Sequence, residues 1–407
     1  MPGGDSATAS LSPARGVVAP LYLAGFTTAF GAHGIAAALG AETGDIGLNL
    51  LTFGLLLALY DLAEVILKPV FGSLSDRIGV KPVIVGGLIA FAAASFCGIF
   101  AGTPILLGVA RLGQGAAAAA FSPASSAAVA RMAGPGAAGR YFGKYGSWKG
   151  LGYALGPLIG AALVGLDGFR ALFIALTILA VATAIWVILA VPRLPVLPRP
   201  RYTLIDLVKQ TVDRSFLIPT LVLAASTGAL GVAVGFLPLL GTTLHLGLFA
   251  SMAAVTVLAL ASTLTQPFVG RLRDNGRIST RTGTTAGLLL IATGIGALAV
   301  IPMPATLYLA ALIIGAGIGV ATPLAFAHLA ATTPAERMGR TMGNAELGRE
   351  VGDAGGPLLV GAVASTVTLG AGLGVLAILT GGVAAVGGLA LRNAASSKPH
   401  NLGRRSY

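Results

Sequence analysis

The sequence contains few charged residues, since Asp, Glu, Lys and Arg together make up 10% of its 407 residues. A soluble domain has roughly 25% charged residues. Aromatic residues are also scarce, at 6%, whereas hydrophobic residues make up 55%. This composition excludes an ordinary soluble protein and indicates a chain whose apolar runs lie in a lipid bilayer.

The sequence also lacks the motifs of several catalytic and cofactor sites. Its single cysteine, Cys97, excludes a disulfide framework, and the apolar run around it predicts a small buried hydrophobe. No glycine-rich loop ends in G-K-[ST], so an ATP-driven pump is unsupported. No residues have metal-ligand spacing, and no Ser, His and acid cluster suggests a hydrolase. We therefore expect no enzyme, no cofactor and no metal.

Twelve apolar stretches are long enough to cross a bilayer as helices, which takes about 20 residues each. They are Val17–Leu39, Leu48–Phe71, Pro82–Ala101, Pro104–Ala130, Tyr141–Leu166, Ala171–Val191, Phe216–Leu240, Gly247–Gly270, Thr282–Ile301, Ala305–Ala331, Gly339–Thr366 and Val367–Leu391. No signal-peptide hydrophobic region precedes Val17, so the first stretch is expected to be a retained helix. Gly370 and Gly372 are expected to mark the turn between the last two stretches.

The basic residues are distributed unevenly over the two sides that these spans define. With Lys149 assigned to the richer side, 22 Lys and Arg residues lie there. The other side receives only Arg170, beside the acidic residues Glu42, Asp45 and Asp167. Because short loops rich in Lys and Arg stay in the cytoplasm, both termini are predicted to be cytoplasmic, in a cell inner membrane. The positive side is expected to meet anionic membrane lipid rather than nucleic acid.

The second half of the chain repeats features of the first about 200 residues further on. "GYALGPLIGAAL" from Gly152 matches "GDAGGPLLVGAV" from Gly352, and "GSLSD" from Gly72 matches "GRLRD" from Gly270. The common order of these matches predicts two six-helix bundles related by an axis along the membrane normal. The expected parts are an N-terminal bundle over 1–191, a cytoplasmic linker over 192–213 and a C-terminal bundle over 214–407.

Three motifs stand out within this frame. The loop after the second span carries a G-x-x-x-D-R-x-G pattern followed by a lysine, with Gly72, Asp76, Arg77, Gly79 and Lys81. The fourth span has R-x-x-Q-G, beginning at Arg111. The fifth span has G-x-x-x-G-P at Gly152, Gly156 and Pro157, and the eleventh repeats it at Gly352, Gly356 and Pro357.

On these motifs the whole chain resembles the major facilitator superfamily of secondary transporters, and in particular its drug/proton antiporters. Val80 replaces the first basic residue at the end of the family's loop motif. The resemblance implies an all-α polytopic membrane protein with 12 transmembrane helices in two pseudo-symmetric six-helix bundles. It also implies that G-x-x-x-G-P is linked to export by exchange.

Elementary chemistry leaves more than one role open for these motifs. Asp76 can accept hydrogen bonds from the amides of a helix start or pair with a cation, and either contact would hold the cytoplasmic ends together. The alternative is a loop whose charges only fix the topology. Pro157 breaks a helix in mid-span beside glycines, so the segment either bends or allows close packing.

Two predicted spans carry charged side chains that share one helix face. On the second span these are Asp61, Glu64 and Lys68, within an arc of about 60°, and on the eleventh Glu346, Arg349, Glu350 and Asp353, within about 100°. Each such charge costs roughly 2.5–3.5 kcal/mol near the bilayer centre, so these faces are expected to line a cavity or to pair.

The resemblance implies that the second and eleventh helices meet where the two bundles touch. The acidic residues of the second helix would then reach Arg349, and Lys68 would reach Glu346 or Glu350. Two interpretations remain open. The charges form structural ion pairs, or at least one carboxylate gains and loses a proton during transport, because burial and a nearby cation favour opposite ionisation states.

The proton-coupling candidates are Asp61, Glu64 and Glu350, followed by Asp353 and Glu346. Arg111 is a further intramembrane cation, either a packing partner or a counter-ion that tunes a carboxylate. His33 and His328 are either packing residues or proton relays.

The sequence thus predicts a monomeric, proton-coupled transporter that works by alternating access. Its substrate cavity is expected to include Phe26, Phe30, His33, Phe121, Ser122, Thr227, Phe236, Thr322 and Phe326. An apolar cavity dotted with aromatic residues suits a hydrophobic or amphipathic small molecule, so export of such compounds is the preferred interpretation. The alternatives are uptake of a small metabolite, translocation of a lipid, or a membrane-embedded enzyme.

Overall fold

The computed structural model describes residues 15–41, 50–134, 136–196 and 213–396, which are almost entirely helical and contain no β-strand. The helices are α1 (Arg15–Ala41), α2 (Leu50–Ile78), α3 (Val80–Gly98), α4 (Pro104–Ala133), α5 (Ala138–Ala190), α7 (Arg214–Thr243), α8 (Leu248–Asp274), α9 (Thr280–Val300), α10 (Pro304–Thr332), α11 (Met338–Thr366) and α12 (Leu369–Ser396), with a short 3-10 helix, η1 (Ala335–Arg337), before α11. Non-helical backbone at Asp167 and Gly168 divides α5 between the expected fifth and sixth spans.

Eight helices within the described residues are long and apolar enough to cross a bilayer. Neither α2 nor α11 is among the eight, and these are the two helices with the charge clusters. Their charges therefore have to be accommodated by neighbouring helices rather than by lipid.

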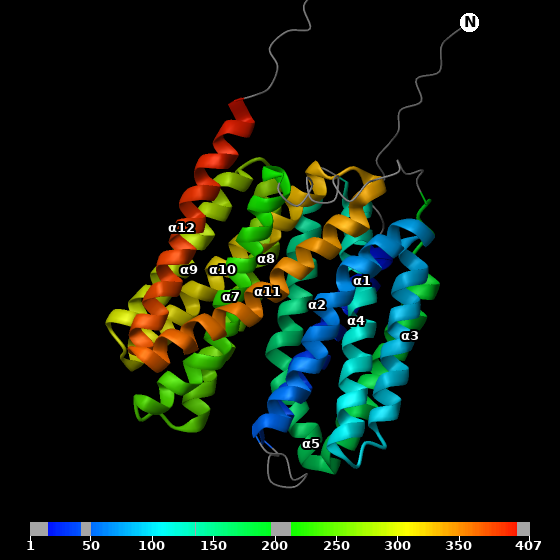
Figure 1. Ribbon diagram of the computed structural model, residues 1–407. Coiled ribbons are helices and arrows are strands. Elements are labelled where there is room, and N and C mark those ends of the chain that lie inside the picture. Colours follow the sequence, from blue (N-terminus) through cyan, green and yellow to red (C-terminus); the bar gives the residue numbers. More distant parts are fainter. Residues whose placement is uncertain (1–14, 42–49, 135, 197–212, 397–407) are drawn as a thin grey trace, which may run out of the picture.

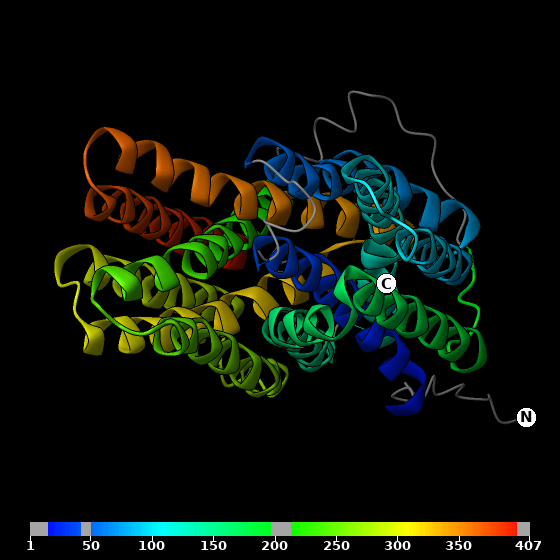
Figure 2. The same ribbon diagram turned by 90° about the horizontal axis from the view of Figure 1, so that it is seen from below.

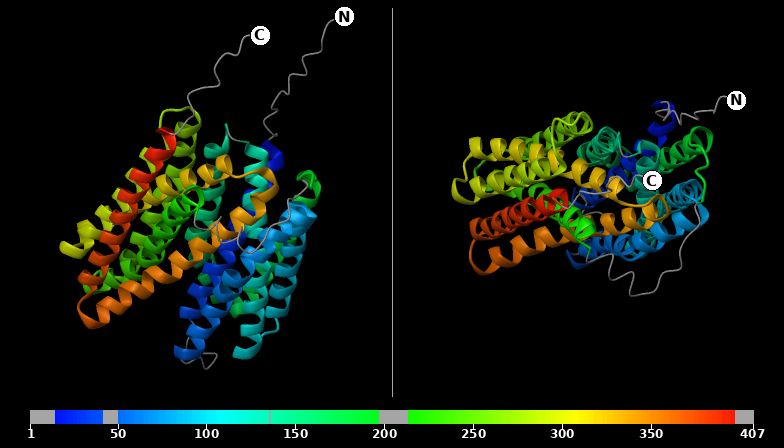
Figure 3. Two further views of the ribbon diagram at one scale, coloured as in Figure 1. Left: turned by 45° about the horizontal axis from the view of Figure 1, so that its top comes forward. Right: turned by 90° about the horizontal axis from the view of Figure 1, so that it is seen from above.

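The helices form two groups that lie side by side, α1 to α5 in one and α7 to α12 in the other (Figure 1). Seen from below, the two groups remain distinct (Figure 2). They are joined chiefly by α2 packing on α11 and by α5 packing on α8. The start of α1 and the end of α12 lie at the same end of the molecule (Figure 3). We call this the terminal end.

The sequence repeat has a structural counterpart in how the helices begin and pack. α4 and α10 both start with a proline in the first turn, Pro104 and Pro304, where a missing N–H costs no helical hydrogen bond. Gly115 of α4 packs on the backbone of Tyr60 in α2, and Gly315 of α10 packs in the same way on Leu258 in α8. The two halves thus use equivalent glycines for equivalent helix pairs.

Three expectations from the sequence are wrong. Cys97 is exposed rather than buried, on the outer face of α3 near Phe96, because apolar side chains can face hydrocarbon without cost. Helix α11 ends before Val367, whereas Gly370 lies inside α12 and packs on the α9 backbone. Lys149, which was counted with the basic residues of the richer side, is a buried residue within α5.

Part of the expected organisation lies outside the described residues. This holds for positions 197–212 of the expected linker and for Glu42 and Asp45 of the expected outer loop.

Candidate functional site

The seam between the two helix groups contains buried ion pairs from α2, α5 and α11. Lys68 Nζ donates to Glu64 Oε2 at 3.0 Å and also to Glu350 Oε1 on α11. Glu346 Oε2 accepts from Lys149 Nζ at 3.0 Å and from Arg349 Nη1 at 3.2 Å. The Lys68 side chain is 1% exposed and that of Glu346 is 0% exposed. These charges are therefore shielded from lipid by one another.

The pairing differs in part from the one expected. Lys68 does reach Glu350, as anticipated for α2 and α11. Within the described part of the chain, however, Arg349 pairs with Glu346 on its own helix and with neither Asp61 nor Glu64. Lys149 of α5, from the other group, also pairs with Glu346, so that Glu346 forms ion pairs with two cations.

Four carboxylates line a small polar cavity between α1, α2, α5 and α11. These are Asp61, Glu64, Glu350 and Asp353, and we call the space the carboxylate cavity; it measures about 30 Å³ and is also lined by Thr28, Ala29, Ala32, His33, Tyr60, Lys149 and Tyr153. A volume of this size can hold water. Asp61 and Asp353 form no ion pair or hydrogen bond with any described residue, unlike Glu64 and Glu350.

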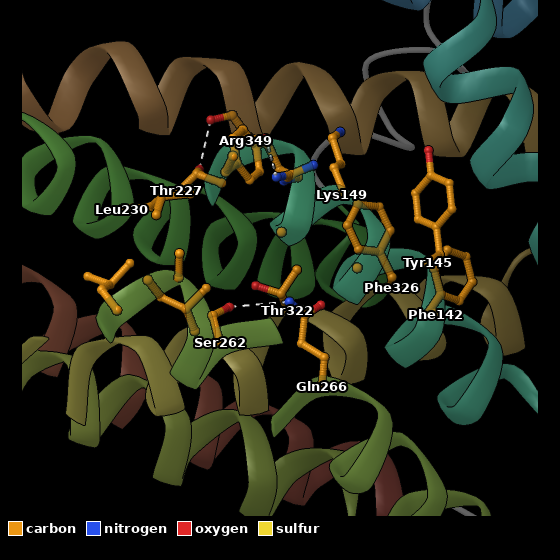
Figure 4. A pocket seen from close by; sticks show the side chains of 16 residues that line it. Phe142, Tyr145, Lys149, Thr227, Leu230, Ser262, Gln266, Thr322, Phe326 and Arg349 are labelled. Carbon is orange, nitrogen blue, oxygen red and sulfur yellow. Dashed lines mark hydrogen bonds between the residues drawn. The ribbon is translucent and has the colours of Figure 1, made fainter. Parts of the chain in front are cut away.

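A second cavity lies between α5, α7, α8, α10 and α11 (Figure 4). It measures about 50 Å³, and we call it the aromatic cavity. Its lining is Phe142, Tyr145, Gly146, Lys149, Gly150, Tyr153, Thr227, Leu230, Leu258, Ala259, Ser262, Gln266, Ile318, Thr322, Phe326 and Arg349. The rings of Phe142 and Phe326 are stacked on each other with centroids 5.3 Å apart, so aromatic side chains of the two groups meet at this cavity.

Lys149 and Tyr153 line both cavities. Tyr153 Oη accepts from Arg349 Nη2 at 3.3 Å, and its ring meets the His33 ring edge-on at 4.4 Å. A change of charge in the carboxylate cavity can therefore reach the aromatic cavity through two side chains of one helix.

Two equivalent contacts hold the helix groups together at the terminal end. Asp76, at the end of α2, accepts from the backbone N–H of Gly339 at 2.7 Å and of Arg340 at 2.8 Å. Asp274, at the end of α8, accepts from the N–H of Gly139 at 2.9 Å and of Arg140 at 2.7 Å. Each aspartate thus caps the start of a helix in the opposite group, a contact favoured by the positive end of the helix dipole.

Glycines make these two contacts possible. A Cβ atom on Gly72 would lie 2.6 Å from the carbonyl oxygen of Gly339, and one on Gly139 would lie 2.5 Å from that of Gly270. We call each set of an aspartate, a helix start and a glycine pair a latch. The latch at Asp76 includes Gly72 and Asp76 of the loop motif. The latch at Asp274 was indicated in the sequence only by the match of "GRLRD" from Gly270 to "GSLSD" from Gly72.

The remaining loop-motif residues shape the connection between α2 and α3. Gly79 has φ 98°, a conformation that favours glycine, and it stands between the two helices. Lys81 Nζ donates to the carbonyl oxygens of Ile188 at 2.8 Å and Val191 at 2.7 Å, which caps the end of α5. Arg77 is exposed.

The glycines of the G-x-x-x-G-P motifs lie at close helix contacts. Gly152 and Gly156 pack on the backbone of α1, and Gly352 and Gly356 pack on the backbone of α7. Both helices continue through their prolines. The arrangement favours the packing role for these glycines.

The residues expected in the substrate cavity are divided among several places. Thr227, Thr322 and Phe326 line the aromatic cavity, and His33 lines the carboxylate cavity. The other five lie elsewhere: Phe26 and Phe30 stack on each other in α1, Phe121 packs edge-on against Phe91, Ser122 is fully buried, and Phe236 lines a separate small apolar space.

Arg111 is buried in α4 at 2% exposure, with its guanidinium 4.4 Å from the centre of the Tyr60 ring. Its Nε and Nη1 atoms have no hydrogen-bond partner among the described residues. His328 is partly buried in α10, away from both cavities.

Sequence reasoning missed Lys149, Tyr153 and Gln266 as site residues. A signal for the first two existed, because Tyr145, Lys149 and Tyr153 are spaced by four residues and therefore share one helix face. Gln266 had no such signal, since it enters the site only through the packing of α8 against α5.

Comparison with known proteins gives a family match over most of the chain. The profile of the Major Facilitator Superfamily matches residues 21–357, and a second match covers residues 220–406. Two solved structures have the same fold, a human organic anion transporter, MFSD10 (TETRAN), and the transporter FucP in the outward conformation. Their TM-scores are 0.78 and 0.76, with 17% and 13% identity, over 93% and 92% of this chain and 99% of each of theirs.

Curated relatives match over shorter segments. A probable actinorhodin transporter of Streptomyces coelicolor is 31% identical over 193 residues, which is 46% of this chain and 33% of that protein. The class G tetracycline resistance protein of Vibrio anguillarum is 38% identical over 129 residues, 31% of this chain and 32% of that protein. The multidrug resistance protein MdtG of Enterobacter lignolyticus is 31% identical over 140 residues, 34% of each chain. The matches thus span about a third of the length of these relatives.

Proposed function

The chain belongs to the Major Facilitator Superfamily, and on that premise we propose that it exports hydrophobic or amphipathic small molecules in exchange for protons. Members of this family are transporters and not enzymes, and the curated relatives named above include drug and antibiotic transporters. One observation carries the proposal: a cavity of carboxylates and a cavity of aromatic side chains share Lys149 and Tyr153.

The proton step is assigned to the carboxylates that lack a cationic partner. Glu64, Glu346 and Glu350 each pair with a lysine or an arginine, so protonating them would strand a buried cation. Asp61 and Asp353 line the same cavity without such a partner among the described residues. They can take and lose a proton without breaking an ion pair, which makes them the preferred coupling residues.

Alternating access is assigned to the two latches. Both latches lie at the terminal end, which the excess of Lys and Arg predicts to be cytoplasmic. With the latches formed, the cytoplasmic end is closed, and release of a proton or a substrate occurs toward the other side. Breaking both latches would let the two helix groups rock about the central cavities, each group moving as one bundle.

The domain organisation follows as part of the proposal. Residues 1–191 form one moving bundle, residues 214–407 form the other, and residues 192–213 link them in the cytoplasm. The protein acts as a monomer in the inner membrane, since both cavities are assembled within one chain.

The test is transport in liposomes with an imposed pH gradient. Purified protein is reconstituted and screened for gradient-driven movement of aromatic compounds, with Asp61→Asn, Asp353→Asn, Glu64→Gln and Glu350→Gln alongside the wild type. If the protein exports the compound, dissipating the gradient should raise the compound's level in cells. If it drives uptake with protons, dissipating the gradient should lower that level. Flux that is unaffected when all four carboxylates are neutralised contradicts the proposal, and movement of phospholipid alone would favour lipid translocation.

A further inference from the structure

The two cavities differ in the charge of the side chains that line them. All four carboxylates named above face the carboxylate cavity. The aromatic cavity is lined by two cations, Lys149 and Arg349, and by no Asp or Glu of the described residues. The four carboxylates and the proposed binding surface for the substrate are therefore separated within the seam.

The carboxylate that pairs with both of these cations lies behind them, outside the cavity lining. Glu346 is fully buried and does not line the aromatic cavity. Its Oε2 accepts from both Lys149 and Arg349, and its Oε1 accepts from Ser126 at 3.1 Å. The two cations thus line the aromatic cavity, whereas Glu346 and Glu350, the carboxylates that act on them, do not line it.

Several buried polar atoms of the aromatic cavity have no protein partner. Arg349 Nε, Gln266 Oε1 and Thr322 Oγ1 make no hydrogen bond within the described chain. Arg349 is 6% exposed and Gln266 is 4% exposed, so burial without a partner is costly for both. Figure 4 shows Gln266 and Ser262 on the opposite side of the cavity from Arg349 and Lys149.

We propose that the aromatic cavity selects flat aromatic compounds that carry an anionic oxygen group, such as a carboxylate, a sulfonate or an ionised phenol. The ring system lies beside Phe142 and Phe326 in the lining, and the anionic oxygens accept from Arg349 and Lys149. A hydroxyl group at the far end donates to Gln266 Oε1. This proposal rests on the proposed function, because it names the substrate class of the same site.

The test compares three probes that share a naphthalene ring and differ in charge. These are 1-naphthoate, 1-naphthalenemethanol and 1-naphthylmethylammonium, and their binding to the purified full-length protein is measured by equilibrium dialysis. The naphthoate is expected to bind at least about tenfold more tightly than the ammonium compound, a ratio that corresponds to about 1.4 kcal/mol.

A charge placed in the cavity tests the same inference without disturbing the ion pairs. Gln266→Glu is almost isosteric and adds a carboxylate to the lining, so it is expected to weaken naphthoate binding about tenfold and to strengthen binding of the ammonium compound. Gln266→Leu is the matched control, and it should keep the preference for the anion. Thermal unfolding of each variant confirms that it folds.

The outcomes separate this inference from the proposed function. In one outcome, the wild type binds the ammonium compound as tightly as the naphthoate or more tightly, while Gln266→Glu still changes the affinity. That result would retain the aromatic cavity as the binding site and overturn its preference for anions. Absence of binding of all three probes, or binding that no Gln266 variant alters, would overturn both the inference and the assignment of the aromatic cavity as the substrate site.

Discussion

At the scale of single residues, the charged side chains of α2 and α11 fall into two kinds. Glu64, Glu346 and Glu350 form ion pairs with cations, whereas Asp61 and Asp353 line the cavity without an ion pair to any residue that the structure describes. The sequence predicted that these residues would share a face, because helical periodicity fixes angular positions. The sequence did not predict which carboxylates form ion pairs, because that depends on where the packing of α5 places Lys149.

Asp61→Asn and Asp353→Asn are expected to abolish gradient-driven transport while substrate exchange without a gradient continues. Each change removes a proton acceptor but leaves the ion pairs around Lys68 and Glu346 intact. The measurement is flux into liposomes with and without a pH gradient. Asp167→Asn is the control, since Asp167 lies in an exposed pair with Arg170. Gradient-driven flux that persists in both cavity variants contradicts the assignment.

Glu346→Gln is expected to destabilise the protein by about 3–5 kcal/mol, because it leaves two buried cations without their shared counter-charge. Thermal unfolding in detergent measures the loss. Combining it with Lys149→Gln should cost less than the sum of the two single changes, since the double variant removes one stranded cation. Additive losses would show that Lys149 and Glu346 do not interact.

At the scale of helices, close approach of α5 to α8 and of α2 to α11 depends on glycine. In both pairs a glycine of one helix lies against the backbone of a glycine in the other, so neither position has room for a side chain. The sequence showed Gly72 in a motif and Gly270 in a repeat of it. It did not show their partners Gly339 and Gly139, because a partner glycine is defined only by helix packing.

Gly139→Ala is expected to separate α5 from α8 at the terminal end, since the new Cβ would meet the Gly270 carbonyl at 2.5 Å. Spin labels on the exposed residues Lys144 and Arg271 would report the longer distance by electron paramagnetic resonance. Gly136→Ala provides a control, because a Cβ there meets nothing within 4 Å. An unchanged distance distribution in Gly139→Ala would refute the packing argument.

At the scale of the whole molecule, the two latches relate the halves to each other. Asp76 and Asp274 occupy equivalent positions at the ends of α2 and α8, and each caps the first turn of a helix in the other group. The positive-inside pattern predicted which end is cytoplasmic. Only the tertiary structure shows that the two groups contact each other through both latches at this same end.

The double variant Asp76→Asn with Asp274→Asn is expected to open the terminal end. Each carboxylate at a helix start contributes about 1 kcal/mol, so loss of both lowers the ratio of closed to open molecules more than about tenfold. The same pair of spin labels measures the shift. Each single variant should have a smaller effect, and a double variant no more open than either single one would argue against two independent latches.

Orientation in the membrane has its own test. In a chain with Cys97→Ser, Lys144→Cys should react with an impermeant thiol reagent only from the cytoplasmic side, and Arg170→Cys only from outside, because short basic loops are retained in the cytoplasm. Labelling is compared between intact cells and inverted vesicles. The opposite pattern would reverse the assignment of the terminal end.

The sequence by itself determined the class of the protein and its helices, and it predicts their direction, because composition, apolar length and loop charge act through local partitioning between water and lipid. It also determined which residues are too costly to expose to lipid. The tertiary structure alone decided how those residues pair, that Lys149 is an internal cation, and that the four carboxylates line one cavity while Phe142 and Phe326 line another. These features arise from contacts between helices far apart in the chain, and no local pattern specifies the side chain that a distant helix brings to a charge.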